Sequence, residues 1–227
     1  MAVRVAAFFS LLVGSALIIV AGPTAPAGSS AKTWNFDSEK AEGPPAGFAF
    51  GRTGSGREGR WVVRAEKGAP SGGNVLAQVD TDDTDYRFPV AVVQDTSLRD
   101  LSLSVKCKPV SGNVDQACGL VFRFKDSNNY YITRANALEN NVRIYYVKEG
   151  NRRQFAGWNG KVTSGEWHDL RVDAKGDHFE VSYDEGDRRN RQELSGCWQD
   201  RLVDQGRFRH VFRQLDRPSD GSAVAGL

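Results

Sequence analysis

The sequence has little net charge, few cysteines and only one long apolar run. Its 227 residues carry 30 basic and 28 acidic side chains, a formal net charge of +2. A nearly balanced chain has no strong field to attract nucleic acid or an anionic membrane, so we expect no nucleic-acid partner. No second long apolar run follows the one near the N-terminus, so we expect no stable membrane span once that segment is cleaved.

Several catalytic and metal-binding motifs are missing. There is no G-x-S-x-G nucleophile elbow, phosphate loop or dinucleotide fingerprint. The three cysteines show no CxxC or Cys–His spacing, which argues against a zinc site. Cys107 and Cys118 flank the turn 109–113 and would face each other if the adjoining strands form a hairpin. In an exported protein they could form a disulfide, and two buried free thiols are the equal alternative.

The first 27 residues are typical of an export signal. Arg4 is the one positive charge before the mostly apolar segment 5–20, and Ala25–Ala27 offers an A-x-A cleavage pattern. The apolar segment is shorter than the ~20 residues of a membrane span, which favours cleavage over an uncleaved anchor. We therefore expect a protein that is secreted or held in the periplasm or cell envelope, with residues 28–33 as a short linker.

Short apolar runs separated by turn residues fill the chain from Trp34 to Asp184. Leu101–Val105 alternates strictly between apolar and polar residues, as a half-buried strand does. In 119–124, alternation places Leu120, Phe122 and Phe124 on a core face and Arg123 on the opposite face. Strands at this spacing, without a helical period between them, predict an all-β antiparallel sandwich or barrel. The expected strands are 61–63, 74–79, 89–93, 101–105, 119–124, 129–134, 141–147, 167–172 and 178–183.

A cluster of motifs carries a family resemblance. The segments 114–123, 128–131, 134–139 and 165–168 resemble LamG-like domains of the concanavalin A-like lectin/glucanase superfamily. The nearest relatives by these motifs are exported bacterial proteins similar to 3-keto-disaccharide hydrolases. The resemblance spans about Trp34 to Tyr183. It implies a two-sheet antiparallel jelly-roll sandwich with one concave face, and an oligo- or polysaccharide as partner.

The resemblance stops near Asp184. From residue 185 onward there are eight arginines and no lysine, whereas residues 1–184 contain nine lysines. Permitted codons for 185–217, read one nucleotide out of register, can encode a segment of the kind that ends this family. We predict that 185–227 is an out-of-frame tail, which leaves the C-terminal strands of the sandwich incomplete or irregular. The alternative is a genuine Arg-rich tail that is disordered or binds a partner.

Candidate sugar-binding residues gather between positions 123 and 145. A sugar site needs planar polar groups for hydroxyls and an aromatic ring for the apolar sugar face. Alternation places Arg123, Arg143 and Tyr145 together on the non-core face of neighbouring strands. A ladder of solvated salt bridges is the alternative interpretation of this face. The predicted substrate-binding residues are Arg123, Asn129, Tyr131, Arg134, Asn136, Glu139, Arg143 and Tyr145.

The case for catalysis is thinner. Glycoside hydrolysis usually needs two carboxylates roughly 5–10 Å apart, and no Glu-x-Asp-x-Glu strand occurs here. The catalytic residues stay unknown, with Glu139 as an isolated candidate. We therefore favour an exported carbohydrate-binding module. A hydrolase of 3-keto-disaccharide-like substrates is the alternative that the resemblance implies, and an envelope structural or protein-interaction domain is the third.

One acidic loop is a candidate metal site. Its carboxylates are the hard oxygen ligands that calcium prefers, but the loop lacks the glycine and distal glutamate of an EF-hand. A solvated connection between strands is the alternative, and no other cofactor is expected. The calcium candidates are Asp80, Asp82, Asp83 and Asp85.

Overall fold

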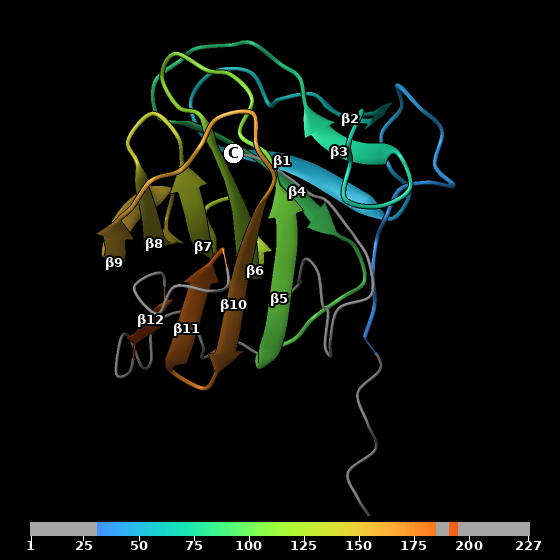
Figure 1. The fold of residues 1–227 in the computed structure, drawn as a ribbon. Helices are drawn as coiled ribbons and strands as arrows, with labels where there is room; N and C mark the ends of the chain where they lie inside the picture. The colour runs from blue at the N-terminus through green and yellow to red at the C-terminus, as the bar shows by residue number, and fades with distance from the viewer. Residues whose placement is uncertain (1–30, 185–190, 195–227) are drawn as a thin grey trace, which may run out of the picture. The chain divides into compact units, whose positions relative to one another are not determined.

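Antiparallel strands make up the regular structure of the computed structural model, which describes residues 31–184 and 191–194 (Figure 1). No helix occurs within those two ranges. The strands are β1 (Phe48–Gly54), β2 (Trp61–Ala65), β3 (Asn74–Gln78), β4 (Arg87–Val93), β5 (Leu101–Cys107), β6 (Ala117–Asp126), β7 (Asn129–Asn136), β8 (Asn141–Lys148), β9 (Asn151–Asn159), β10 (His168–Lys175), β11 (His178–Tyr183) and β12 (Arg191–Leu194).

Two four-stranded sheets face each other. One has the strand order β12-β11-β10-β5 and the other β6-β7-β8-β9, while β1 pairs with β4 and β2 with β3. Aromatic rings join the large sheets: Phe122 of β6 and Tyr131 of β7 lie 5.5 Å and 5.4 Å from Phe179 of β11. Ring pairs at such distances stabilise a core beyond their buried area. The predicted all-β antiparallel sandwich is confirmed.

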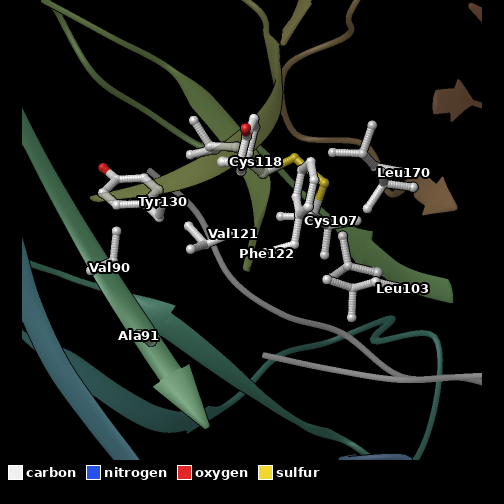
Figure 2. Packing of buried hydrophobic residues seen from close by; sticks show 14 of the residues in the cluster. Val90, Ala91, Leu103, Cys107, Cys118, Val121, Phe122, Tyr130 and Leu170 are labelled. Atoms are coloured by element: carbon white, nitrogen blue, oxygen red, sulfur yellow. A yellow bond between two sulfur atoms is a disulfide. The ribbon is translucent and has the colours of Figure 1, made fainter. Parts of the chain in front are cut away.

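The alternating sequence explains how the interior is filled. Along β10, Leu170, Val172 and Ala174 are buried, while the residues between them are polar. Each fully buried Leu or Val side chain stabilises the fold by about 1.5–3 kcal/mol relative to an exposed one. Figure 2 shows Leu170 packed with Leu103 of β5 and Phe122 of β6, so the apolar faces of both sheets meet in one core.

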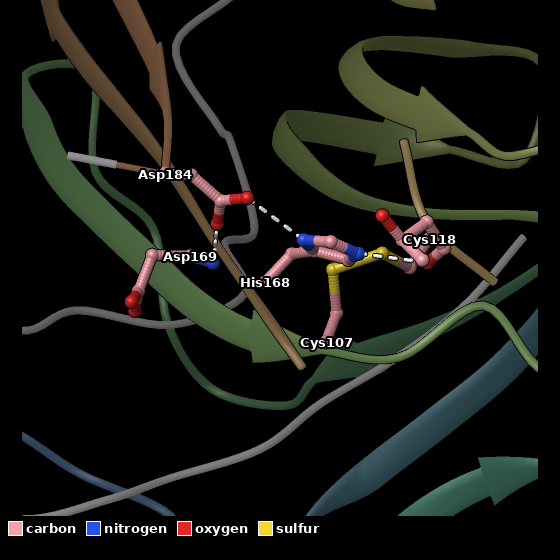
Figure 3. The surroundings of a disulfide bond; sticks show 6 residues. Cys107, Cys118, His168, Asp169 and Asp184 are labelled. Carbon is pink, nitrogen blue, oxygen red and sulfur yellow. Dashed lines mark hydrogen bonds and ion pairs between the residues drawn. A yellow bond between two sulfur atoms is a disulfide. The ribbon is translucent and has the colours of Figure 1, made fainter. Parts of the chain in front are cut away.

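A disulfide links the two sheets. Cys107, at the end of β5, is bonded to Cys118 of β6. The two strands belong to different sheets, so the cysteines are bonded across the sandwich and not across a hairpin, and the free-thiol alternative is wrong. His168 lies beside the bond (Figure 3), with Nδ1 2.8 Å from Asp184 Oδ2 and Nε2 2.8 Å from the Thr163 carbonyl. These two contacts fix the orientation of the buried ring, which gives it a structural role.

An irregularity in β6 overturns the predicted side-chain alternation. The register with β7 shifts between Phe122 and Asp126, and Arg123 adopts a positive φ of 49°. As a result the Arg123 guanidinium turns into the sandwich, 4.9 Å from the centroid of Phe179. Phe124 lies instead near Tyr130, 5.7 Å between ring centroids. Bulges re-aim side chains in this way.

The ends of the chain lie largely outside the described residues. The described strands belong to one compact unit that begins at Ala31, so the predicted signal peptide at 1–27 is not covered. Of the predicted out-of-frame tail, only β12 is described, and it pairs antiparallel with β11. Among the described residues, no helix is long and apolar enough to cross a membrane.

Candidate functional site

The register of β6–β9 places three rows of side chains on the face that points away from β5, β10 and β11. We call this the distal face. Its central row crosses all four strands, and the flanking rows start from Ala117 and Val121 on β6. The rows are Gly119–Arg134–Arg143–Gly157, Ala117–Asn136–Asn141–Asn159, and Val121–Ile132–Tyr145–Gln154.

Glycines at both ends of the central row leave room for its two arginines. A Cβ on Gly119 would lie 3.1 Å from Arg134 Cβ, and one on Gly157 would lie 2.8 Å from Arg143 Cδ. Gly157 also has a φ of +143°, which other residues rarely adopt. Arg143 donates to the carbonyl of Trp158 at 2.7 Å and, through Nη2, to an asparagine side chain in the next row.

Arg134 is the centre of a buried hydrogen-bond network. Its Nη2 donates to Glu139 Oε2 at 2.8 Å and to the Tyr145 hydroxyl at 3.0 Å, and its Nη1 donates to Asn141 Oδ1 at 3.1 Å. Asn141 in turn donates to the same Glu139 oxygen at 2.8 Å. With only 2% of Arg134 exposed, these partners fix its orientation.

The two acids of the distal face have pKa values shifted in opposite directions. The hydrogen bond from Arg134, followed by that from Asn141, holds the pKa of Glu139 below its ordinary value. Burial raises the pKa of Asp115, which accepts a hydrogen bond from the Asn136 side chain. Burial alone would lower the pKa of Arg134, but its bond to Glu139 and the neighbouring acids give a net increase.

A second guanidinium lies on the other side of Tyr145. Arg152 of β9 is between two rings, 3.6 Å from the centroid of Phe88 and 4.6 Å from that of Tyr145. Tyr86 adjoins it: the ring is 4.9 Å from Phe88 and the hydroxyl accepts from the Arg152 backbone N–H at 2.6 Å. Tyr86 is 41% exposed and Tyr145 only 7%, so Tyr86 is the ring that a ligand can reach.

Two buried N–H groups of this cluster lack a hydrogen-bond partner among the described residues. They are Nε of Arg134 and Nη1 of Arg152. A buried donor without a partner costs about 1–3 kcal/mol, and a guanidinium more. Such groups are candidates for ligand recognition, because a ligand oxygen supplies the missing acceptor.

The structure brings five of the eight predicted substrate-binding residues together. Arg134, Asn136, Arg143 and Tyr145 lie on the distal face, and Glu139 reaches it from the turn after β7. All five belong to the Arg134 hydrogen-bond network or to the three rows described above. Among the described residues of this face, the alternative of a salt-bridge ladder accounts for one ion pair, Arg134–Glu139.

The other three predicted residues lie elsewhere. Arg123 is buried in the sandwich, where it donates to the carbonyls of Arg99 and Gly176. Tyr131 is stacked on Phe122 in the core, because alternation along β7 turns it away from Arg134. Asn129 is the first residue of β7, where its side chain donates to Asp126.

Sequence reasoning missed four residues of the cluster. Asp115 lies within the motif 114–123, and Asn141 stands between the predicted positions Glu139 and Arg143, which was the available signal. Arg152 and Tyr86 carried no such signal. They meet through a contact between positions 66 residues apart, which no local pattern reports.

The acidic loop forms ion pairs with arginines. Asp80 accepts from Arg57 at 3.0 Å and from Arg87 at 3.1 Å, and Asp82 accepts from the Arg57 backbone N–H at 2.6 Å. The pKa of Asp82 is well below its ordinary value, first because of that backbone hydrogen bond and then because of Thr84. Within the described ranges, no group of three or more acidic, histidine or cysteine side chains could hold a metal ion.

Comparison with known proteins identifies no family for this chain. No protein-family model and no curated protein matches the chain. Among solved structures, it is similar to the carbohydrate-binding module CBM66 from Bacillus subtilis, with 21% identity and a TM-score of 0.47. The match covers 61% of this chain and 74% of that module. A likeness at this level carries no argument about function, which has to come from the distal face.

Proposed function

We propose that this chain is an exported carbohydrate-binding protein of the LamG-like, concanavalin A-like type, and that the distal face is its binding site. Arg134 carries the proposal. It is held rigidly by Glu139, Asn141 and Tyr145, yet its Nε has no acceptor among the described residues. Preorganised polar groups bind sugar hydroxyls with little loss of conformational entropy.

The composition of the distal face also supports sugar binding. One row carries three amide side chains. Asn136 and Asn141 are buried and bonded within the protein, whereas the exposed Asn159 offers a donor and an acceptor that match hydroxyl groups. The exposed ring of Tyr86, next to Arg152, provides an apolar surface at the edge of the face. The resemblance of the sequence to LamG-like domains points to the same class of ligand.

The test is a glycan array followed by titration calorimetry on the full chain. Tyr86→Ala is expected to weaken binding at least about tenfold, because it removes the reachable ring from an exposed position. Tyr86→Phe is the matched control, since it keeps the ring and should bind within a few-fold of the parent. Equal binding by both variants would contradict the assignment of the Tyr86 ring to the sugar-binding site.

A second control separates the two faces of one strand. Tyr145 and Tyr146 are neighbours on β8 and point to opposite faces of the sheet. Tyr145→Phe removes the hydroxyl that Arg134 contacts and should weaken binding, whereas Tyr146→Phe should not. A blank array would overturn the proposal and favour an envelope structural or protein-interaction domain.

A second candidate function is hydrolysis of a 3-keto-disaccharide-like substrate. One observation favours it: Asp115 and Glu139 share the distal face and have pKa values shifted apart, upward by burial and downward by Arg134. Such pairs suit an acid and a base working together. Release of reducing sugar from a 3-keto-disaccharide, abolished by both Glu139→Gln and Asp115→Asn, would support it. Binding without turnover would rule it out.

A further inference from the structure

The distal face carries more positive than negative charge, and the excess is localised. Among the described residues, its arginines are Arg134, Arg143 and Arg152, and its acids are Asp115 and Glu139. Glu139 is paired with Arg134 at 2.8 Å, so that pair is neutral. Burial disfavours ionisation of Asp115 by raising its pKa. Among the described residues, neither of the other two arginines forms an ion pair, although Asp115 interacts with Arg152 at longer range.

The contacts of these two arginines are with neutral groups. Arg143 donates to the carbonyls of Val142 and Trp158 and to the side chain of Asn159. The guanidinium of Arg152 lies between two aromatic rings, and within the described ranges it has no carboxylate partner. Burial lowers the pKa of Arg152, and the interaction with Asp115 offsets this only in part.

Arg143 and Arg152, the two arginines without an ion pair among the described residues, lie on either side of Tyr145. Arg143 is two residues from Tyr145 on the same face of β8, and the Arg152 guanidinium is 4.6 Å from the Tyr145 ring. A planar guanidinium held between rings has its orientation fixed, and its fork of N–H donors matches the two oxygens of a carboxylate. Tyr86 adjoins Arg152 and offers a surface for the sugar ring that bears the acid.

We infer that the glycan bound by the distal face carries a carboxylate, as a uronic acid does, and that Arg152 binds this group with support from Arg143. The inference rests on the proposed function and narrows its ligand class. Glu139 is already paired with Arg134, so an acidic sugar would supply an anion for Arg143 and Arg152. It would also give the buried Nη1 of Arg152 a hydrogen-bond acceptor. A neutral glycan would leave both arginines without an ion pair among the described residues.

The experiment compares acidic oligosaccharides with their neutral esters. Oligogalacturonates and glucuronate-containing oligosaccharides are titrated into the full chain, each beside its methyl ester, which has the same shape without the charge. The acids should bind at least about tenfold more tightly, as expected for a charge-assisted hydrogen bond. The difference should shrink as salt rises from about 0.05 M to about 0.5 M.

Variants assign the effect to its residue. Arg152→Gln should abolish the preference for the acid, so that the acid and its ester bind this variant with affinities within about twofold of each other. Arg64→Gln is the matched control: it makes the same charge change at an exposed position on β2. Circular dichroism checks that each variant folds. If Arg152→Gln does not fold, the comparison of acids with esters on the parent chain still tests the inference.

The outcomes separate the inference from the proposed function. Esters that bind as tightly as the acids would overturn the inference and leave the carbohydrate site standing. Binding of sulfated oligosaccharides but not of uronates would overturn the carboxylate assignment. Failure of every acid and every ester, together with a blank glycan array, would overturn both.

Discussion

Loss of the disulfide between Cys107 and Cys118 should lower stability by an amount that follows from the size of the loop it closes. The two residues are 11 positions apart. In the chain-entropy account, a cross-link over so short a loop stabilises the folded state by about 3 kcal/mol, because it restricts the unfolded chain. Both cysteines are buried, 2% and 1% exposed, so the reduced thiols keep most of their packing.

Guanidinium unfolding of oxidised and reduced protein measures this difference without changing any side chain. A Cys197→Ser background prevents exchange with the third thiol. The reduced form should unfold at lower denaturant with a steeper dependence on its concentration, since its unfolded chain is more expanded. The double variant Cys107→Ala/Cys118→Ala should lose at least as much, because it also removes two buried sulfur atoms.

A loss of less than about 1 kcal/mol on reduction would refute the reasoning. It would mean that the unfolded chain already keeps the two strands together. A loss well above about 5 kcal/mol would also contradict it, since loop closure alone does not reach that value. The disulfide would then be supporting the packing of one sheet on the other.

Four further predictions concern the site and its surroundings. Glu139→Gln should remove a part of the stability that depends on pH. Because the folded pKa of Glu139 is lowered, this contribution is present above the unfolded pKa of about 4.3 and is lost as pH falls through the folded pKa. Solvent screening of this half-exposed side chain limits the contribution to about 1 kcal/mol, which urea unfolding at several pH values measures. Gly157→Ala should lower the melting temperature through a loss of about 1–3 kcal/mol, because a Cβ would lie 2.4 Å from a backbone carbonyl, whereas Gly160→Ala meets nothing closer than 3.6 Å and should not. Arg123→Gln should cost about 2 kcal/mol in denaturant unfolding and leave glycan affinity unchanged; weaker binding by the folded variant would return Arg123 to the site. Resequencing the gene across codon 184 should reveal a displaced reading frame, and an intact frame that encodes the same tail would refute that prediction.

Most strands could be predicted because their apolar residues alternate. The ones that were missed lack this pattern for identifiable reasons. β9 begins with Asn151, two arginines and a glutamine, and most of its side chains are exposed or half-buried. β1 contains Gly51, whose Cβ would collide with Ser127, and ends at a glycine. Such strands are specified by the neighbours they pair with, which a local pattern does not report.

The site was predictable only as far as strict alternation holds. Arg134 and Asn136 share a face because they are two residues apart on a regular strand, and Arg143 and Tyr145 do so for the same reason. At Arg123 the register shifts, and the direction of the side chain then depends on packing against the opposite sheet.

The irregularity in β6 decides which side of the sheet a cation serves. If this strand were straightened so that Arg123 left its left-handed conformation, regular alternation would place its guanidinium on the distal face. The sandwich would lose the guanidinium that closes it between Phe179 and the carbonyl of Gly176. Such a variant would lose a buried cation from the core and gain a positive charge on the distal face. The conformation of β6 is therefore a means to engineer the charge of the binding surface.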